Sequence, residues 1–256
     1  SAEPASAPPS AAPFTIPHEL GGGLEITIDA IGYRGGVISD AQLVAAMSNG
    51  EITITRASAL LPGGSDLAIA GTIDADQGVP RFAGAVEASS DNLRSLLDWL
   101  SAPLPVDIAS DRLRQLSMTG RITATPSLLQ VADIDLRVDA SRATGGIAVA
   151  LPEPGVRVKP GFGVGLAVDK INLDGYLGTG EAGAGAEPGQ SEGSGRSATP
   201  GEVPAGLPLH VLRPLAEFDA NIELRVGSLT YNRQTMQGLH VDGTLQAGNL
   251  TLRDLS

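Results

Sequence analysis

The chain has 256 residues, a net charge of −12 and no cysteine. The acidic balance argues against a basic surface for nucleic acid or anionic lipid headgroups, and the absence of cysteine excludes disulfides, thiolate metal sites and cysteine nucleophiles. Aromatic residues make up only 3%, whereas glycine and proline number 33 and 18. We therefore expect an aliphatic core and many short strands separated by turns.

Composition divides the chain into two β-rich units and two linkers. Residues 1–19 are rich in alanine and proline, which is typical of an extended linker. Residues 178–206 are a low-complexity mixture of glycine, serine and glutamate, which buries too little apolar surface to offset its ordering entropy. We predict one β-rich unit at 20–177, a disordered linker at 178–206 and the start of a second β unit at 207–256.

The first unit opens with a half-buried strand. Apolar and polar residues alternate from Leu24 to Asp29, which places them on opposite faces. Residues 37–47 predict a second strand, although their alanine-rich part could also form a helical turn. Asn49-Gly50 is a strong hairpin signal. Further strands are expected at 51–56, 66–74, 82–88, 117–125, 128–139, 147–151 and 164–173.

One helix interrupts the strands, near residues 91–101. Its leucines recur at the spacing of a helical face, and they are Leu93, Leu96, Leu97 and Leu100. Ser90 could cap its N-terminus, Trp99 could dock its end, and Pro103 stops it. Short helical turns are also expected near 111–116 and within 207–218.

A repeated stretch organises the chain. Shifted by 198 positions, Leu24–Ile54 lies without a gap on Ile222–Leu252, so that Ile26 falls on Leu224. Few residues are identical, but the apolar positions coincide. This pattern predicts an internal repeat, and we expect the chain to be a fragment of a longer repetitive protein.

The short motifs that suggest chemistry lack their structural context. Residues 189–193 match a G-x-S-x-G elbow and residues 178–183 match a dinucleotide fingerprint, but both lie where no helix is expected to follow. The histidines His18, His210 and His240 are far apart in sequence. We therefore predict no catalytic residue, no cofactor and no metal site.

The aspartates leave one weaker alternative. Asp133, Asp135 and Asp139 share one face of a predicted strand, and Asp74 and Asp76 resemble the start of a calcium loop. A weak cation site is conceivable there. Solvated strand faces and turns account for both groups without a ligand.

The remaining signal is a continuous apolar face on the predicted strands. It is either an ordinary core under or between sheets, or an open groove that binds acyl chains through burial alone. The residues predicted to line such a groove are Ile26, Ile28, Ile52, Ile54, Leu67, Ile69, Ile134, Leu136, Val138 and Leu166.

Four stretches resemble the AsmA family of envelope proteins. GVGLAVDKINLDGYL at 163–177 resembles a family strand signature, and residues 218–255 resemble the C-terminal repeat of the family. Residues 139–149, DASRATGGIAV, resemble its acidic-turn-glycine strand pair, and residues 56–100 resemble the segment between these modules. The resemblance covers most of the two β units and leaves out the linkers.

The resemblance implies a mainly β protein built as an elongated, curved antiparallel groove with one or two short helices. It also implies a periplasmic, non-enzymatic protein that supports outer-membrane biogenesis, anchored to the inner membrane by a helix that this chain lacks. Phospholipid acyl chains and envelope proteins would be its partners. Two other functions stay open: a structural or protein-interaction scaffold whose apolar face is fully buried, and a hydrolase built from Asp and Ser.

Overall fold

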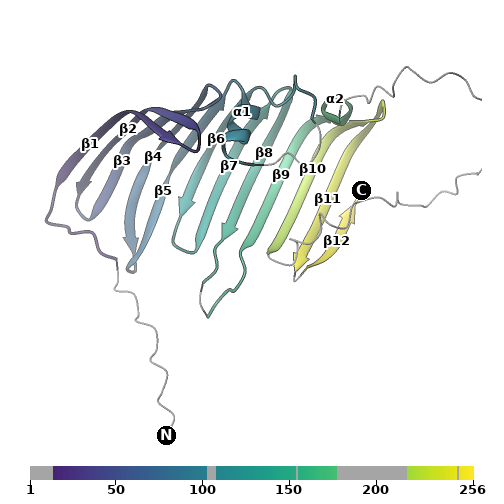
Figure 1. Cartoon of the computed structure of the whole chain (residues 1–256). Coiled ribbons are helices and arrows are strands. Elements are labelled where there is room, and N and C mark those ends of the chain that lie inside the picture. The colour runs from purple at the N-terminus through teal and green to yellow at the C-terminus, as the bar shows by residue number, and fades with distance from the viewer. Residues whose placement is uncertain (1–13, 103–107, 154, 178–217, 247) are drawn as a thin grey trace, which may run out of the picture.

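The described part of the chain forms one curved, open sheet of twelve strands, whose spatial order follows the sequence (Figure 1). The computed structural model describes residues 14–102, 108–153, 155–177, 218–246 and 248–256. The prediction of a mainly β fold with short helices is confirmed. The elements are β1 (Gly22–Tyr33), β2 (Gly36–Ser48), β3 (Glu51–Leu61), β4 (Ser65–Asp76), β5 (Val79–Ser90), α1 (Leu93–Trp99), β6 (Leu116–Ala124), β7 (Leu128–Val138), β8 (Ser141–Ala150), β9 (Gly161–Asn172), α2 (Leu173–Leu177), β10 (Asp219–Tyr231), β11 (Gln234–Gln246) and β12 (Asn249–Leu255).

The sheet is antiparallel except at one junction. β9 and β10 pair in parallel, with Leu166 beside Leu224, whereas every other neighbouring pair is antiparallel. Parallel neighbours need a connection that returns the chain to the opposite end of the sheet, and residues 173–218 lie between these two strands in the sequence. The predicted second unit therefore continues the sheet of the first. Most of the predicted linker at 1–19 and all of that at 178–206 lie outside the described residues. All but the last residue of the range 207–218, where a helix is expected, also lies outside them.

The repeat seen in the sequence is a repeated hairpin. Ile26 pairs with Leu43 in the β1–β2 hairpin, and Leu224 pairs with Val241 in the β10–β11 hairpin. Both partners are shifted by the same 198 positions, so the two hairpins have one register. Their turns also agree: Arg34 and Gly35 have positive φ values, as do Asn232 and Arg233. The shared apolar positions thus encode a shared strand pairing.

The two faces of the sheet differ in chemistry. Residues directly paired across neighbouring strands point to the same face. One complete row across the sheet contains only apolar residues and glycine, and it defines what we call the apolar face: Leu24, Ala45, Ile54, Gly71, Gly84, Ile122, Val131, Ile147, Val164, Ile222, Gly243 and Leu252. The adjacent row, on the opposite or polar face, includes Thr53, Thr72, Thr123, Gln130, Asn221 and Thr244.

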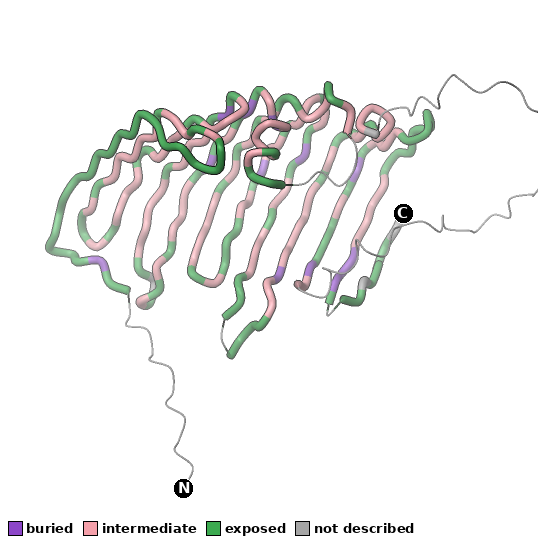
Figure 2. The backbone as a smooth tube through the Cα atoms, in the orientation of Figure 1, coloured by how far each residue is buried: buried purple, intermediate pink, exposed green. Residues whose placement is uncertain are grey.

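The sheet is a single layer in the described part of the chain. Contacts between elements run chiefly between neighbouring strands, and no second sheet packs against the first. Figure 2 accordingly shows mostly half-buried and exposed residues, with buried ones scattered along the strands. Val226 and Ile134 still reach 2% and 4% exposure. Such burial without a covering layer is what a curved sheet produces, because side chains on its inner side converge and cover one another.

Several local predictions need correction. The cap of α1 is Asn92 and not Ser90, because the Asn92 side chain accepts a hydrogen bond from the Ser95 N–H. Ser90 is instead buried and accepts a hydrogen bond from Ser65 at 2.7 Å. Residues 111–113 form a turn and bends, and β6 begins at Leu116, so the helical turn expected near 111–116 is not formed. The alanine-rich part of residues 37–47 is strand in β2, whereas Leu173–Leu177 forms the short helix α2.

Candidate functional site

The apolar face carries an open hollow of about 400 Å³ over strands β1–β4. Its aliphatic lining comes from all four strands: Ile26, Ile28, Ala41, Leu43, Ala57, Ala59, Leu67 and Ile69. Gln42 and Ser58 also border it, although they pair with each other in a row that belongs to the polar face. The hollow therefore offers an apolar surface with no side-chain charge.

Four of the ten predicted groove residues line this hollow, namely Ile26, Ile28, Leu67 and Ile69. The other six lie on the same face of the sheet, farther along or across it. Their pairing shows this: Ile52 with Ile73, Ile54 with Gly71, Leu136 with Ala143, Val138 with Leu116, and both Ile134 and Leu166 with Gly145. Ile134 is only 4% exposed, so it supports the face from within and presents little surface to a ligand.

Sequence reasoning missed Leu43 and the three alanines of the hollow. The strand pairing is shifted between Ser39 and Gln42 and again between Val44 and Ala45. Each shift is a β-bulge, which resets the alternation of faces along a strand. Asp40 marks the first shift with a φ of 50°. A further shift, between Ile54 and Ala57, means that strict alternation from Ile52 and Ile54 places Ala57 and Ala59 on the wrong face. Ala41 and Leu43 alternate regularly with Ala45 against β1, and they lie in the alanine-rich stretch for which the sequence also allows a helical turn.

A helix crosses the ends of the first strands. The Asn92 N–H donates to the Gly63 carbonyl at 2.9 Å, so α1 folds back over the β3–β4 turn. At its other end the Trp99 Nε1–H donates to the Tyr33 carbonyl at 2.9 Å, and the two rings meet edge to face at 6.2 Å. The expectation that Trp99 docks the helix is confirmed. α1 thereby ties the β1–β2 turn to the β5–β6 connection.

The opposite strand ends are crossed by the segment that leads into β1. The Phe14 N–H donates to the Gly78 carbonyl at 2.8 Å, and the His18 Nδ1 lies 3.0 Å from the Asn49 carbonyl oxygen. Ile16, between them, is 6% exposed. Part of the predicted N-terminal linker is thus packed against the β2–β3 and β4–β5 turns. The hollow lies between this segment and α1.

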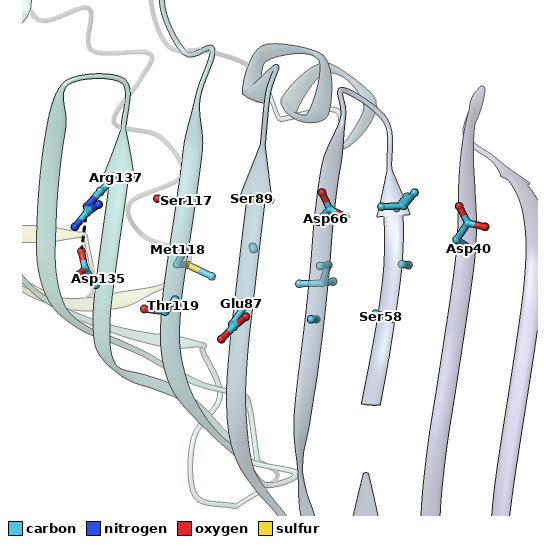
Figure 3. A pocket seen from close by; sticks show the side chains of 15 residues that line it. Asp40, Ser58, Asp66, Glu87, Ser89, Ser117, Met118, Thr119, Asp135 and Arg137 are labelled. Carbon is cyan, nitrogen blue, oxygen red and sulfur yellow. Dashed lines mark ion pairs between the residues drawn. The ribbon is translucent and has the colours of Figure 1, made fainter. Parts of the chain in front are cut away.

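The polar face has a larger hollow, of about 630 Å³, over β2–β7 (Figure 3). Its polar lining includes Asp40, Asp66, Glu87, Asp135 and Arg137. In the described part of the chain, no hydrogen bond joins a serine of this hollow to a carboxylate. No group of three or more His, Asp or Glu residues there has the arrangement of a metal site. Its lining also includes Leu60, Leu67 and Met118, so the hollow is a mixed surface that carries four carboxylates and one guanidinium.

Asp135 is held by arginines on its own and the next strand. Its carboxylate accepts hydrogen bonds from Arg142 at 2.6 and 2.9 Å, and Arg137 lies 3.9 Å away. The hydrogen-bonded Arg142 guanidinium lowers the pKa of Asp135 below its ordinary value. Asp133 instead forms an ion pair with Arg121. The predicted cation alternative at these aspartates is therefore disfavoured, because each carboxylate has a cationic partner.

Asp139 has a structural role at the end of β7. Its carboxylate accepts hydrogen bonds from the backbone N–H groups of Leu113, Arg114 and Gln115, at 2.8 to 3.2 Å, and from the Tyr176 hydroxyl. Burial raises the pKa of Asp139, but these hydrogen bonds outweigh it, so the pKa lies below the ordinary value. Burial, followed by the nearby Asp139 charge, raises the pKa of Tyr176. Asp139 thus connects α2 to the chain that precedes β6.

The two motifs noted in the sequence, at 178–183 and 189–193, lie outside the described residues, as does His210. His18 and His240 lie on opposite parts of the sheet, near β2–β3 and on β11. No helix in the described part of the chain has the length and hydropathy needed to cross a membrane.

Comparison with known proteins finds no relatives: no protein-family model, no curated protein and no solved structure matches this chain. The resemblance to the AsmA family therefore stays a prediction from the sequence. The fold and the apolar face are observed in the structure and do not depend on that resemblance.

Proposed function

We propose that this chain is a non-enzymatic segment of an AsmA-like protein and binds phospholipid acyl chains along its apolar face. One observation carries the proposal: an uninterrupted row of apolar residues and glycine crosses all twelve strands, and the described part of the chain places no second layer over it. An apolar surface of this extent that faces water marks a binding site for another apolar surface.

The chemistry of the hollow over β1–β4 suits hydrocarbon. Aliphatic walls hold an acyl chain without directional contacts, and each CH₂ group removed from water contributes about 0.8 kcal/mol. The lining needs no charged group for this purpose. The acidic polar face, with Asp66 and Glu87, stays in water and keeps the sheet soluble.

The cellular setting of the proposal rests on the sequence resemblance. It places the chain in the periplasm, as part of a protein anchored to the inner membrane that supports outer-membrane biogenesis. Phospholipids and envelope proteins would be its partners, and nucleic acid would not.

Uptake of a fluorescent phospholipid by the purified chain tests the proposal. Changing Ile26 and Ile28 together to Asp puts two charges into the hollow while leaving an exposed edge strand, so uptake should fall at least about tenfold. Thr27→Asp is the matched control, since Thr27 lies between them on the opposite face and its variant should bind as the parent does. Equal uptake by all three proteins, with their folds intact, would contradict the proposal.

A second candidate is a scaffold that binds proteins at a sheet edge. One observation favours it: every residue of β1 is exposed, and an exposed edge strand presents unpaired backbone groups to another strand. Measuring the uptake of the fluorescent phospholipid over a range of concentrations separates the two functions. A chain that takes up no phospholipid at any concentration would favour the scaffold.

A further inference from the structure

The first hairpin matches the second in more than its register. Four residues with positive φ in or just after the β1–β2 hairpin have counterparts with positive φ 198 positions later. The pairs are Arg34 and Asn232, Gly35 and Arg233, Asp40 and Gly238, and Gly50 and Gly248. β1 therefore lies in the same backbone setting as β10, and the two strands present matching outer edges.

The outer edge of β10 is occupied, and that of β1 is not. β9 lies parallel to β10 and pairs with it chiefly through residues 161–168 against 219–226. Among the described strands, β1 pairs with β2 alone and forms the edge of the sheet (Figure 1). The burial differs accordingly: Val226 is 2% exposed, whereas its counterpart Ile28 is 39% exposed. A parallel neighbour like β9 is what β1 lacks.

The described residues leave the β1 edge accessible. The segment before β1 packs against the β2–β3 and β4–β5 turns, away from this edge, and α1 reaches only the end of β1, through the hydrogen bond from Trp99 to the Tyr33 carbonyl. β1 contains no proline and no lysine, which natural edge strands use against unwanted pairing. Its Glu25 matches Glu223 of β10, which pairs with a strand on each side, so a carboxylate at this position permits pairing.

Asp29 limits how far an added strand can run. Its counterpart in β10 is Gly227, where a Cβ would lie 2.6 Å from the Asp169 carbonyl oxygen of β9. Nonbonded atoms do not approach so closely, and this oxygen belongs to the backbone, so a side chain at this position keeps a strand from lying as near as β9 does. An added strand therefore has room beside residues 22–28 and loses the pairing that β10 makes at 228–230.

We propose that the outer edge of β1 binds an extended segment of a partner protein, which lies parallel to residues 22–28. β9 defines the chemistry of that segment, because its residues 162–168 alternate apolar side chains on the apolar face with glycine and alanine on the polar face. In the β9–β10 register, the apolar side chains of the partner lie beside Leu24, Ile26 and Ile28. The bound segment thus extends the apolar face by one strand.

A partner protein suits this edge better than a second copy of the chain. Two copies joined β1 to β1 by a two-fold axis, with both apolar faces on one side, would pair antiparallel, whereas the β9–β10 pairing is parallel. The inference deepens the scaffold candidate, because it names the orientation and the chemistry of the partner. It does not rest on acyl-chain binding.

Binding of a synthetic peptide tests the edge site. A fluorescent peptide with the sequence of residues 161–172 should bind the parent chain saturably, measured by anisotropy, and a peptide of scrambled sequence should not. Asp29→Gly should bind the peptide at least about fivefold more tightly, because the pairing continues past position 29, whereas Asp29→Asn keeps the Cβ and should bind as the parent does. No binding by the parent, equal binding of the scrambled peptide, or an equal gain in Asp29→Asn would overturn the proposal.

A paramagnetic label on the N-terminus of the peptide locates the bound strand. Parallel pairing should broaden the amide signals near Gly22 and spare those near Tyr33. The opposite pattern, or broadening along β10 through displacement of β9, would overturn the proposal. Sedimentation of the chain alone should give a monomer, and an assembly through β12 of a second copy would overturn the assignment to a partner protein. Phospholipid uptake by the same preparation is a separate readout, so failure of this edge and failure of the groove are distinguishable.

Discussion

Ile26 and Leu224 occupy the same position in two hairpins of identical register, yet they differ in how many strands flank them. Ile26 pairs with Leu43 on one side, and its strand is the edge of the sheet, which leaves it 40% exposed. Leu224 pairs with Val241 on one side and with Leu166 on the other. The parallel junction between β9 and β10 therefore decides how deeply this position of the repeat is buried.

Truncation of these two residues should have unequal effects on stability. Leu224→Ala should lower the free energy of unfolding by about 1 to 3 kcal/mol, because a half-buried side chain loses contacts with two neighbouring strands. Ile26→Ala should cost less than about 1 kcal/mol, because water already reaches Ile26. Urea denaturation followed by circular dichroism measures both. Equal losses would contradict the edge position of β1.

The docking of α1 should depend on the absence of a side chain at Gly36. A Cβ at Gly36 would lie 2.5 Å from Trp99 Nε1 and 2.8 Å from Pro62 Cγ, so Gly36→Ala should cost about 1 to 3 kcal/mol by overpacking. Gly32→Ala is the control, because nothing lies within 4 Å of its Cβ position. Fluorescence of Trp99, the only tryptophan, should report greater solvent exposure in the first variant alone. An unchanged spectrum in Gly36→Ala would count against this docking.

Asp139 should make stability depend on pH in the acid range. Its pKa in the folded state lies below the ordinary value of 3.8, so its contribution is present above about pH 4 and is lost as the pH falls through the folded-state pKa. Asp139→Asn removes the charge and tolerates the φ of 50° at this position. The variant should be less stable than the parent by about 1 to 2 kcal/mol at neutral pH, a modest figure because solvent partly screens the carboxylate.

Parallel denaturation curves of parent and variant check this prediction. The difference between them should shrink as the pH falls below about 4, because the carboxylate of the unfolded parent binds a proton first and that of the folded parent follows at lower pH. A difference that stays constant over this range would show that the charge of Asp139 contributes nothing.

Asp174 should protect the turn of the second hairpin. Its carboxylate oxygens accept hydrogen bonds from the backbone N–H groups of Asn232 and Arg233, at 2.6 and 2.7 Å. In Asp174→Ala these amides should exchange at least about tenfold faster with deuterium, because a charge-assisted hydrogen bond is lost at each. At the matching turn, the amides of Arg34 and Gly35 donate to no side chain of the described residues, and Trp99 bonds only the Tyr33 carbonyl, so these amides should exchange as before. Unchanged exchange at Asn232 would refute the role of Asp174.

Local sequence pattern accounts for most of the strands. Alternation from Leu24 onward and the Asn49-Gly50 turn predict β1–β3 correctly, because facing and turn type depend on neighbouring residues. The repeat predicts the register of the second hairpin for the same reason. The helix near 91–101 follows from its leucine spacing. Its cap does not, because Asn92 and Ser90 are both good capping residues and only the folded β3–β4 turn decides between them.

Features that depend on contacts between residues far apart in the sequence could not be predicted from local sequence pattern. The parallel pairing of Leu166 with Leu224 joins residues on either side of a low-complexity segment, and periodicity within one strand says nothing about its neighbour. The burial of Ile16 depends on turns far along the chain. Bulges beside Asp40 and at Asp133, both with positive φ, shift the facing of the residues that follow. The shift after Ile54 in the β3–β4 pairing accounts for the missed Ala57 and Ala59. Leu43 lies in the alanine-rich stretch that the sequence leaves open between strand and helical turn.

Photo-crosslinking from two adjacent positions of β4 tests the acyl-chain groove most directly. Ile69 borders the apolar hollow and not the larger hollow of the polar face, whereas Ala68 pairs with Glu87 on the polar face. A photoreactive amino acid at each position, in chain purified from a Gram-negative host without detergent, would be irradiated and analysed for lipid adducts by mass spectrometry. We predict phospholipid crosslinked through its acyl chain at position 69 and none at position 68. Adducts at neither position, or equal adducts at both, would contradict an acyl-binding apolar face.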